Sequence, residues 1–145
     1  YRGDDGAGLY VSRNIHAKSF PHVKTVCGIS NGTQLLDVWD SAHAAFVVDC
    51  VVSTADPGVI YRFDALNESL PEGLFNNCST HCFSVAKSIE LAGVLERLPT
   101  KLVVYGIVGS DFKTGAGLSA KVRSAADEVT ARIVREVDQV CQVTG

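Results

Sequence analysis

The feature that most constrains the fold is an unbroken apolar run at residues 44–52, which contains β-branched and aromatic side chains and a single carboxylate, Asp49. Such a run is typical of a strand that is buried on both faces of a parallel sheet. An ionised carboxylate is costly to bury alone, so we expect Asp49 to lie at the open end of the strand, to be paired, or to bind a metal. The alternative is that the strand stops there and Asp49 caps a turn.

The rest of the chain alternates predicted strands with predicted helices. Further strands are expected at residues 23–27, 59–63 (an edge strand) and 101–108, and residues 64–80 are expected to be irregular. Helical spacing of apolar residues predicts helices over residues 7–18, after Thr33, over 81–97 and over 119–141. This order predicts a single α/β domain over residues 1–145, a three-layer α/β/α sandwich with a mostly parallel, twisted sheet and one antiparallel edge strand.

Composition excludes several classes of function. The chain has 145 residues and a net charge of −3, so it has no basic surface for nucleic acid or an anionic membrane. It contains neither an apolar run of membrane-spanning length nor a signal-peptide pattern. Its five cysteines are an odd number without the spacing of a disulfide framework, which indicates reduced thiols and a cytoplasmic location.

Polar residues from three separate segments are expected at one edge of the sheet. Asp4 and Asp5 precede the first predicted helix, Asp49 lies near the end of the central strand, and His81 opens a later helix. Ligands bind beyond the carboxyl ends of the strands in open α/β sheets. A helix N-terminus stabilises the Asp pair and keeps His81 neutral, so two carboxylates and an imidazole form an open site for a divalent first-row metal. The alternatives are that the Asp residues are only helix caps and that His81 is solvated.

A second candidate site is Cys78-x₃-Cys82, which encloses His81 and offers ligands for a structural zinc. No second Cys/His pair follows nearby to complete four ligands, which counts against it. The chain contains no P-loop, no G-x-S-x-G and no H-E-x-x-H motif. A Ser or Cys nucleophile stays open, because its partners need not be close in sequence.

Short motifs occur in a fixed order over nearly the whole chain. They are Gly-Asp-Asp-Gly-Ala-Gly at residues 3–8, Val-Val-Asp-Cys at 47–50, Pro-Gly-Val at 57–59, Ser-Thr-His at 79–81, Leu-Pro at 98–99, Tyr-Gly-Ile at 105–107 and Gly-Leu-Ser at 117–119. Together they resemble the nickel-iron hydrogenase maturation endopeptidases. In that family a first strand lies upstream of the first motif, so the resemblance implies a strand before Tyr1.

The resemblance implies an activity and a site. Members of the family remove a C-terminal extension from the precursor of the hydrogenase large subunit after nickel insertion. Nickel in the precursor is then the recognition element, and Asp5, Asp49 and His81 are the residues that contact it. The expected partner is therefore this precursor, and the expected metal is nickel presented by the substrate, with no tightly bound cofactor of the protease's own.

The expected reaction is metal-assisted hydrolysis of one peptide bond. Asp5, Asp49 and His81 complete the coordination of the nickel, and a water activated by the metal or by a spare carboxylate such as Asp4 attacks the carbonyl. Three alternatives stay open: a non-catalytic α/β module that binds a metallated partner, a metal-dependent hydrolase of another substrate, and an iron(II) enzyme with two carboxylates and one histidine.

Overall fold

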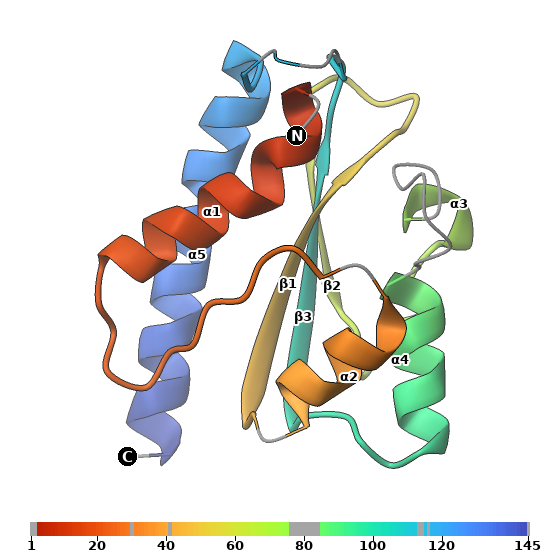
Figure 1. Cartoon of the computed structure of the whole chain (residues 1–145), viewed down its shortest axis with the longest axis vertical. Helices are drawn as coiled ribbons and strands as arrows, with labels where there is room; N and C mark the ends of the chain where they lie inside the picture. The colour runs from red at the N-terminus through yellow and green to blue at the C-terminus, as the bar shows by residue number, and fades with distance from the viewer. Residues whose placement is uncertain are drawn as a thin grey trace.

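The structure is a computed structural model that describes residues 3–29, 31–40, 42–75, 85–112, 115 and 117–144. Figure 1 shows its elements, which follow one another along the chain as one 3₁₀ helix, five α-helices and three strands. They are η1 (Gly3–Gly6), α1 (Ala7–Ala17), α2 (Gly32–Trp39), β1 (Ala44–Val51), β2 (Ile60–Asp64), α3 (Glu72–Phe75), α4 (Val85–Val94), β3 (Lys101–Val108) and α5 (Ala120–Thr144).

The strands form a mixed sheet in the order β1-β3-β2. Strand β1 is parallel to β3, with Asp49 opposite Gly106, and β2 is antiparallel to β3, with Ile60 opposite Ile107. The predicted antiparallel edge strand is therefore confirmed, whereas the described sheet is mixed, with one parallel and one antiparallel pair, and not mostly parallel. Because β1 and β3 run the same way, their carboxyl ends lie at one edge of the sheet, which we call the carboxyl edge.

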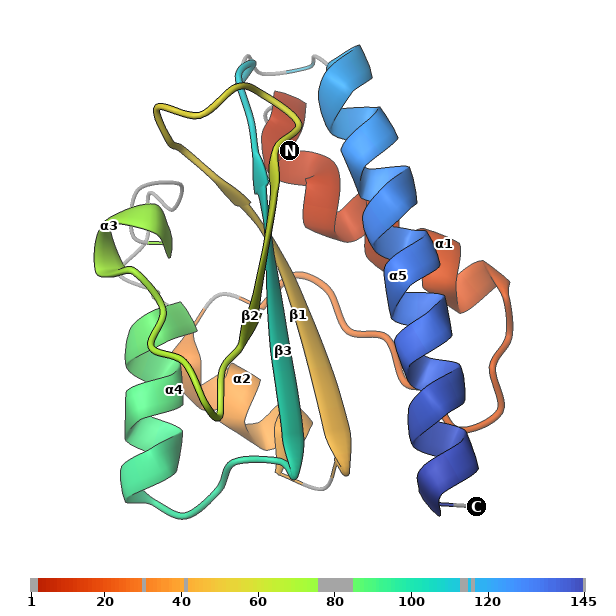
Figure 2. The ribbon, with the colours of Figure 1, turned by 180° about the vertical axis from the view of Figure 1, so that it is seen from behind.

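Helices cover both faces of the sheet, and Figures 1 and 2 show the resulting layers from the two sides. Helices α1 and α5 pack on one face around Val11, Tyr105 and Val129, whereas α2, α3 and α4 pack on the other around Trp39 and Phe75. Apolar residues spaced three or four apart direct one stripe of each helix toward the strands. Two hydrophobic clusters, one on each face of the sheet, follow from this arrangement.

The expectation that residues 44–52 form the central, doubly buried strand is wrong for the described sheet, in which β3 is central and the most deeply enclosed strand. Every residue of β3 after Lys101 is buried, whereas β1 is fully buried only at its carboxyl-terminal residues. The difference arises because β3 has a neighbouring strand on both sides, while in the described sheet β1 has a strand on one side.

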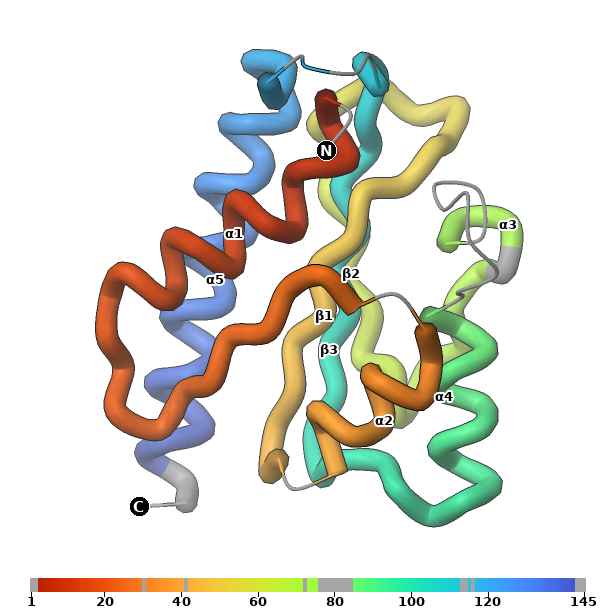
Figure 3. Tube along the Cα trace, in the orientation of Figure 1, coloured from red at the N-terminus to blue at the C-terminus, as the bar shows by residue number. Residues whose placement is uncertain are grey.

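The predicted strand at residues 23–27 is wrong. In the structure, residues 23–29 have no regular secondary structure and connect α1 in one helical layer to α2 in the other, as the tube in Figure 3 shows. The β-branched composition favours an extended chain there, but a strand also requires a neighbour that accepts its backbone hydrogen bonds. No described strand pairs with this segment.

The helix predictions are largely confirmed. The helix predicted over residues 81–97 is described from Val85 to Val94, and residues 81–84 lie outside the described part of the chain. The segment predicted to be irregular contains the short helix α3. Within the described ranges, no helix combines the length and the apolar character needed to cross a bilayer.

Candidate functional site

Asp4 lies at the carboxyl edge and is completely buried. Its carboxylate accepts hydrogen bonds from the backbone N–H groups of Ser110 (2.8 Å), Asp111 (2.9 Å) and Ser119 (2.8 Å) and from the Ser119 hydroxyl (3.1 Å). Burial acts to raise the pKa of Asp4, but these hydrogen bonds outweigh it and hold the pKa below its ordinary value. Asp4 therefore joins η1, the loop after β3 and the start of α5 as an ionised structural carboxylate.

The backbone around Gly3 makes this arrangement possible. Gly3 has a φ of +56°, and a Cβ atom at this position would lie 2.1 Å from the Asp111 carbonyl oxygen. The Asp4 N–H donates to that same oxygen at 2.6 Å. A glycine before the acidic pair therefore lets η1 approach the loop after β3 closely enough for Asp4 to enter it.

Asp49 lies near the carboxyl end of β1. Its side chain is on the same face of the sheet as Val47 and Val51, which pack against Phe75 of α3 in the hydrophobic cluster of that face. Burial is the largest influence on its ionisation and raises the pKa of Asp49 to about 6, although the Cys50 backbone N–H donates a hydrogen bond that favours the carboxylate.

Asp5 contributes a second negative charge to the same place. Asp5 belongs to η1 and is partly exposed, and its charge further raises the pKa of Asp49. Two carboxylates that oppose each other's ionisation bind either a proton or a cation favourably. The structure thus brings together Asp5 and Asp49, which are far apart in sequence, as a candidate half of a cation site.

His81, the third predicted ligand, lies in residues 76–84, outside the described residues. The described residues on either side of this segment, Phe75 and Val85, both belong to the hydrophobic cluster on the face that carries Asp49. In the part of the chain that the structure describes, no three His, Cys, Asp or Glu side chains form a metal-binding group.

The zinc alternative falls on the same segment, since Cys78 and Cys82 also lie outside the described residues. The described Cys27, Cys50 and Cys141 are free thiols. Cys50 is buried, and its sulfur would lie 2.7 Å from a Cβ atom added at Gly109, so its role is to fill space beside the Asp4 loop.

The sequence does not separate the roles of Asp4 and Asp5, nor does it identify the groups that bind Asp4. Backbone N–H groups supply most of those hydrogen bonds, and a backbone donor has no signature in the side-chain sequence. The glycines after residue 108 indicate a turn at the right place, but nothing in the sequence shows that the turn closes on Asp4.

A family model matches most of the chain. The family model HycI, described as hydrogenase maturation protease, matches residues 10–136. No curated protein sequence matches the chain.

Solved structures match over nearly the whole chain. The hydrogenase maturating endopeptidase HybD from Escherichia coli is similar with a TM-score of 0.80 and 17% identity, covering 96% of this chain and 86% of that one. An endopeptidase from Escherichia coli, solved in solution, is similar with a TM-score of 0.77 and 19% identity over 95% of this chain and 86% of its own. The [NiFe] hydrogenase maturation protease HycI from Thermococcus kodakarensis has a TM-score of 0.65 and 19% identity, with 92% and 83% covered.

Proposed function

The chain belongs to the hydrogenase maturation protease family and is a peptidase, and on this premise we propose that it removes the C-terminal extension of a nickel-iron hydrogenase large-subunit precursor once nickel has been inserted. The nickel arrives on the substrate and serves as the recognition element. Cleavage is then restricted to a precursor that already contains its metal.

The observation that carries the proposal is the half-buried Asp49 carboxylate, whose pKa is raised by burial and by the charge of Asp5, at the carboxyl edge. The ionised form of a carboxylate with a raised pKa is destabilised by its surroundings, and a second carboxylate nearby adds to this effect. A cation that replaces the proton therefore stabilises such a carboxylate strongly. A divalent metal is such a cation, and carboxylate and imidazole groups suit a first-row metal. The pair therefore supports the use of Asp5 and Asp49 as contacts to the nickel of the precursor.

His81 completes the proposed set. Its imidazole is the nitrogen ligand that a first-row metal accepts beside two carboxylates. Three protein ligands leave coordination positions for the thiolates of the precursor and for water. They would fix the metal, and with it the peptide bond that is cut, relative to the protein.

The same geometry assigns Asp4 a positioning role instead of the role of a base. Its carboxylate already accepts four hydrogen bonds and its pKa is lowered, so it is a poor proton acceptor. Its contribution is to hold η1, and therefore Asp5, against the strand ends. The metal itself supplies the activation, because a divalent ion polarises a carbonyl and acidifies water.

The location and partner follow from the same proposal. The enzyme would act in the cytoplasm, where thiols such as Cys27 and Cys141 stay reduced, and its partner would be the precursor.

The experiment is to incubate the full-length protein with the cognate precursor in nickel-loaded and nickel-free forms. Intact-mass spectrometry is expected to show loss of the C-terminal extension only from the nickel-loaded form. Equal cleavage of both forms would contradict nickel as the recognition element, and tight nickel-dependent binding without any loss of mass would favour a non-catalytic module.

A further inference from the structure

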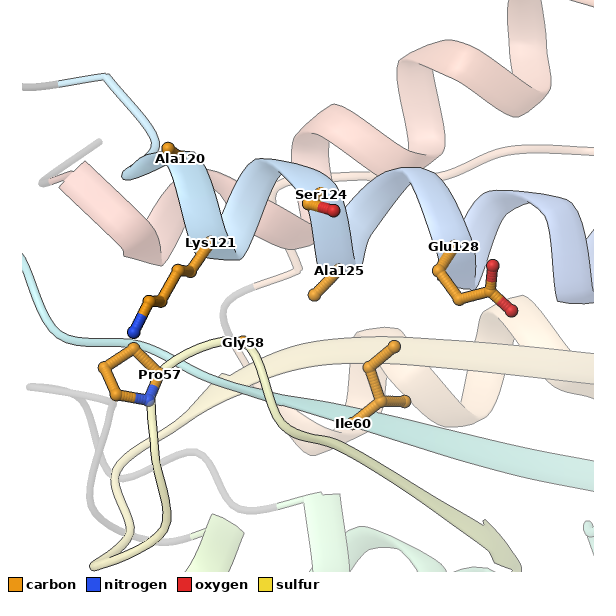
Figure 4. Close-up of a pocket in the computed structure, with 8 residues that line it drawn as sticks. All are labelled: Pro57, Gly58, Ile60, Ala120, Lys121, Ser124, Ala125 and Glu128. Carbon is orange, nitrogen blue, oxygen red and sulfur yellow. The ribbon is translucent and has the colours of Figure 1, made fainter.

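A groove lies between the start of β2 and the first turns of α5. Its volume is about 500 Å³, and its lining includes Pro57, Gly58 and Ile60 on the sheet side and Lys121, Ala125 and Glu128 on the helix side. Figure 4 shows the Ile60 side chain directed toward α5 and the Lys121 side chain extended toward Pro57. The groove thus has an apolar floor and a charged residue from α5 at each end.

One wall of the groove is β2, whose outer edge is open in the part of the sheet that the structure describes. On either side of β2, the Val108 N–H donates to the Val59 carbonyl (3.0 Å) and the Ala65 N–H donates to a β3 carbonyl (2.9 Å). With Ile60 opposite Ile107, this register makes the odd-numbered residues of β2 the ones whose backbone groups face β3. Antiparallel strands alternate the direction of their backbone groups. The N–H and C=O groups of Ile60 and Arg62 are therefore directed away from β3, toward the open edge.

The groove can hold only a short extended segment. Arg62 forms an ion pair with Glu136 of α5, which closes the groove beyond Ile60. Lys121 and Glu128 are separated by about 10 Å along the helix axis, which is the length of roughly three extended residues. A strand added at Ile60 would direct alternate side chains into the groove, over Ala125.

The charges of the groove favour an acidic occupant. Glu128 is compensated by Arg132 (3.0 Å) and Arg135 (3.8 Å). Among the described residues, Lys121 has no ion-pair partner, and it is exposed. A carboxylate on the bound segment would therefore have its most favourable electrostatic interaction beside Lys121.

The Lys121 end of the groove lies at the carboxyl edge, as does the Asp5–Asp49 pair. The Gly58 N–H donates to the carbonyl of Val108, the last residue of β3, at 2.8 Å. The residue before α5, Ser119, is hydrogen-bonded to Asp4. A peptide held at the Asp5–Asp49 pair can therefore continue over the strand ends into the groove.

We propose that this groove binds the C-terminal extension of the precursor as a short strand added to the Ile60 edge of β2, with a carboxylate of the extension beside Lys121. This inference rests on the proposed function and adds a second contact surface to it. Backbone hydrogen bonds to β2 supply affinity that tolerates varied sequences, and the groove and Lys121 supply selectivity.

The test uses two groove variants of the full-length protein, Ser124→Trp, which fills the groove, and Lys121→Glu, which reverses its free charge. Ser124 is exposed and lines the groove. With nickel-loaded precursor, each variant is expected to raise KM by about 10-fold or more and to change kcat by less than about twofold.

Two control variants carry the same chemical changes elsewhere. Gln139→Trp places a tryptophan at an exposed position about 22 Å further along α5, and Lys24→Glu reverses an exposed charge in the connection between α1 and α2. Both controls are expected to keep the KM of the wild type. Thermal melts of all four variants check that each is folded.

The outcomes separate this inference from the function on which it rests. If the wild type cleaves nickel-loaded precursor and both groove variants keep its KM, the groove proposal is wrong and the proposed function remains. If the wild type leaves the precursor intact, both fail. A self-associated wild type that Ser124→Trp converts to monomer without a change in KM would assign the β2 edge to a second copy of the chain and overturn the proposal.

Discussion

Asp4 is a buried carboxylate and Asp49 a half-buried one near the same edge of one sheet, and their surroundings differ in nearly every respect. Asp4 accepts hydrogen bonds from two segments of backbone and from a hydroxyl, and its pKa is lowered. Asp49 has the Cys50 N–H as a donor, lies on a face packed with apolar side chains beside a second carboxylate, and its pKa is raised to about 6. Burial alone therefore does not determine what a carboxylate does.

The difference separates a carboxylate that the fold stabilises from one that the fold opposes. Donors that are fixed by the fold satisfy Asp4, so its charge stabilises the folded state. Among the described residues, the Cys50 N–H offsets only part of the effect of burial on Asp49, so its charge is costly in the folded protein. An unfavourable ionisation of this kind is typical of functional sites, where a residue serves the binding of a ligand and not the stability of the fold.

The largest expected effect is on stability, from Asp4→Ala. The variant removes a fully buried carboxylate and leaves the part-buried N–H donors of Ser110, Asp111 and Ser119 without this acceptor, so we expect the free energy of unfolding to fall by about 4 kcal/mol. Urea denaturation measures it. The adjacent Asp5→Ala is the matched control and should change stability by less than about 0.5 kcal/mol. Equal losses in both variants would remove the distinction between the two acids.

The next effect is on activity, from Asp49→Asn. Loss of even an outer partner of a metal site costs 10–100-fold in general, so loss of a ligand should reduce processing of nickel-loaded precursor by more than about 100-fold. The rate is measured by intact-mass spectrometry. Asp138→Asn, at an exposed position on α5, is the control and should process normally. Normal processing by Asp49→Asn would contradict the proposed role of Asp49.

The third effect is on the pH dependence of stability in metal-free protein. The pKa of Asp49 is raised in the folded state to about 6, so the folded protein holds this proton more tightly than the unfolded chain does. The contribution of Asp49 to stability is thus complete below the unfolded pKa of about 4 and is lost as pH rises through 6, by about 2–3 kcal/mol.

Asp49→Asn isolates this contribution, because an amide does not titrate. Relative to the wild type, the variant should become more stable as the pH is raised from about 4 to about 7. Urea titrations of both proteins across this range measure the difference. A constant difference would show that the environment of Asp49 does not oppose its ionisation.

The smallest effect is expected from Ser119→Ala. It removes one of the hydrogen bonds to Asp4, the hydroxyl contact at 3.1 Å, and leaves the Ser119 N–H in place. The free energy of unfolding should fall by about 1 kcal/mol, and Ser110→Ala, whose contribution to Asp4 comes from its backbone N–H, should have a smaller effect. A loss as large as that of Asp4→Ala would mean that the hydroxyl, and not the backbone, holds the carboxylate.

The sequence was sufficient to predict those elements whose pattern is local. The apolar runs at residues 44–52 and 101–108 became β1 and β3, and the helical spacing after residue 119 became α5. The strand expected at residues 23–27 did not form, because a strand depends on a partner that lies elsewhere in the chain. The same limit applies to the order β1-β3-β2, which no local pattern specifies.

For the candidate site, the sequence by itself determined which residue types were available and that Asp49 was the one charge in an apolar strand. The rule that ligands bind at the carboxyl ends of strands led to the prediction that Asp5 and Asp49 share a site, and the effect of the Asp5 charge on the pKa of Asp49 is consistent with that prediction. Only the tertiary structure decided that Asp4 is satisfied by backbone donors while Asp49 is opposed by Asp5. The physical reason is that ionisation depends on solvent, donors and charges gathered from distant segments, and the chain sets these only when it folds.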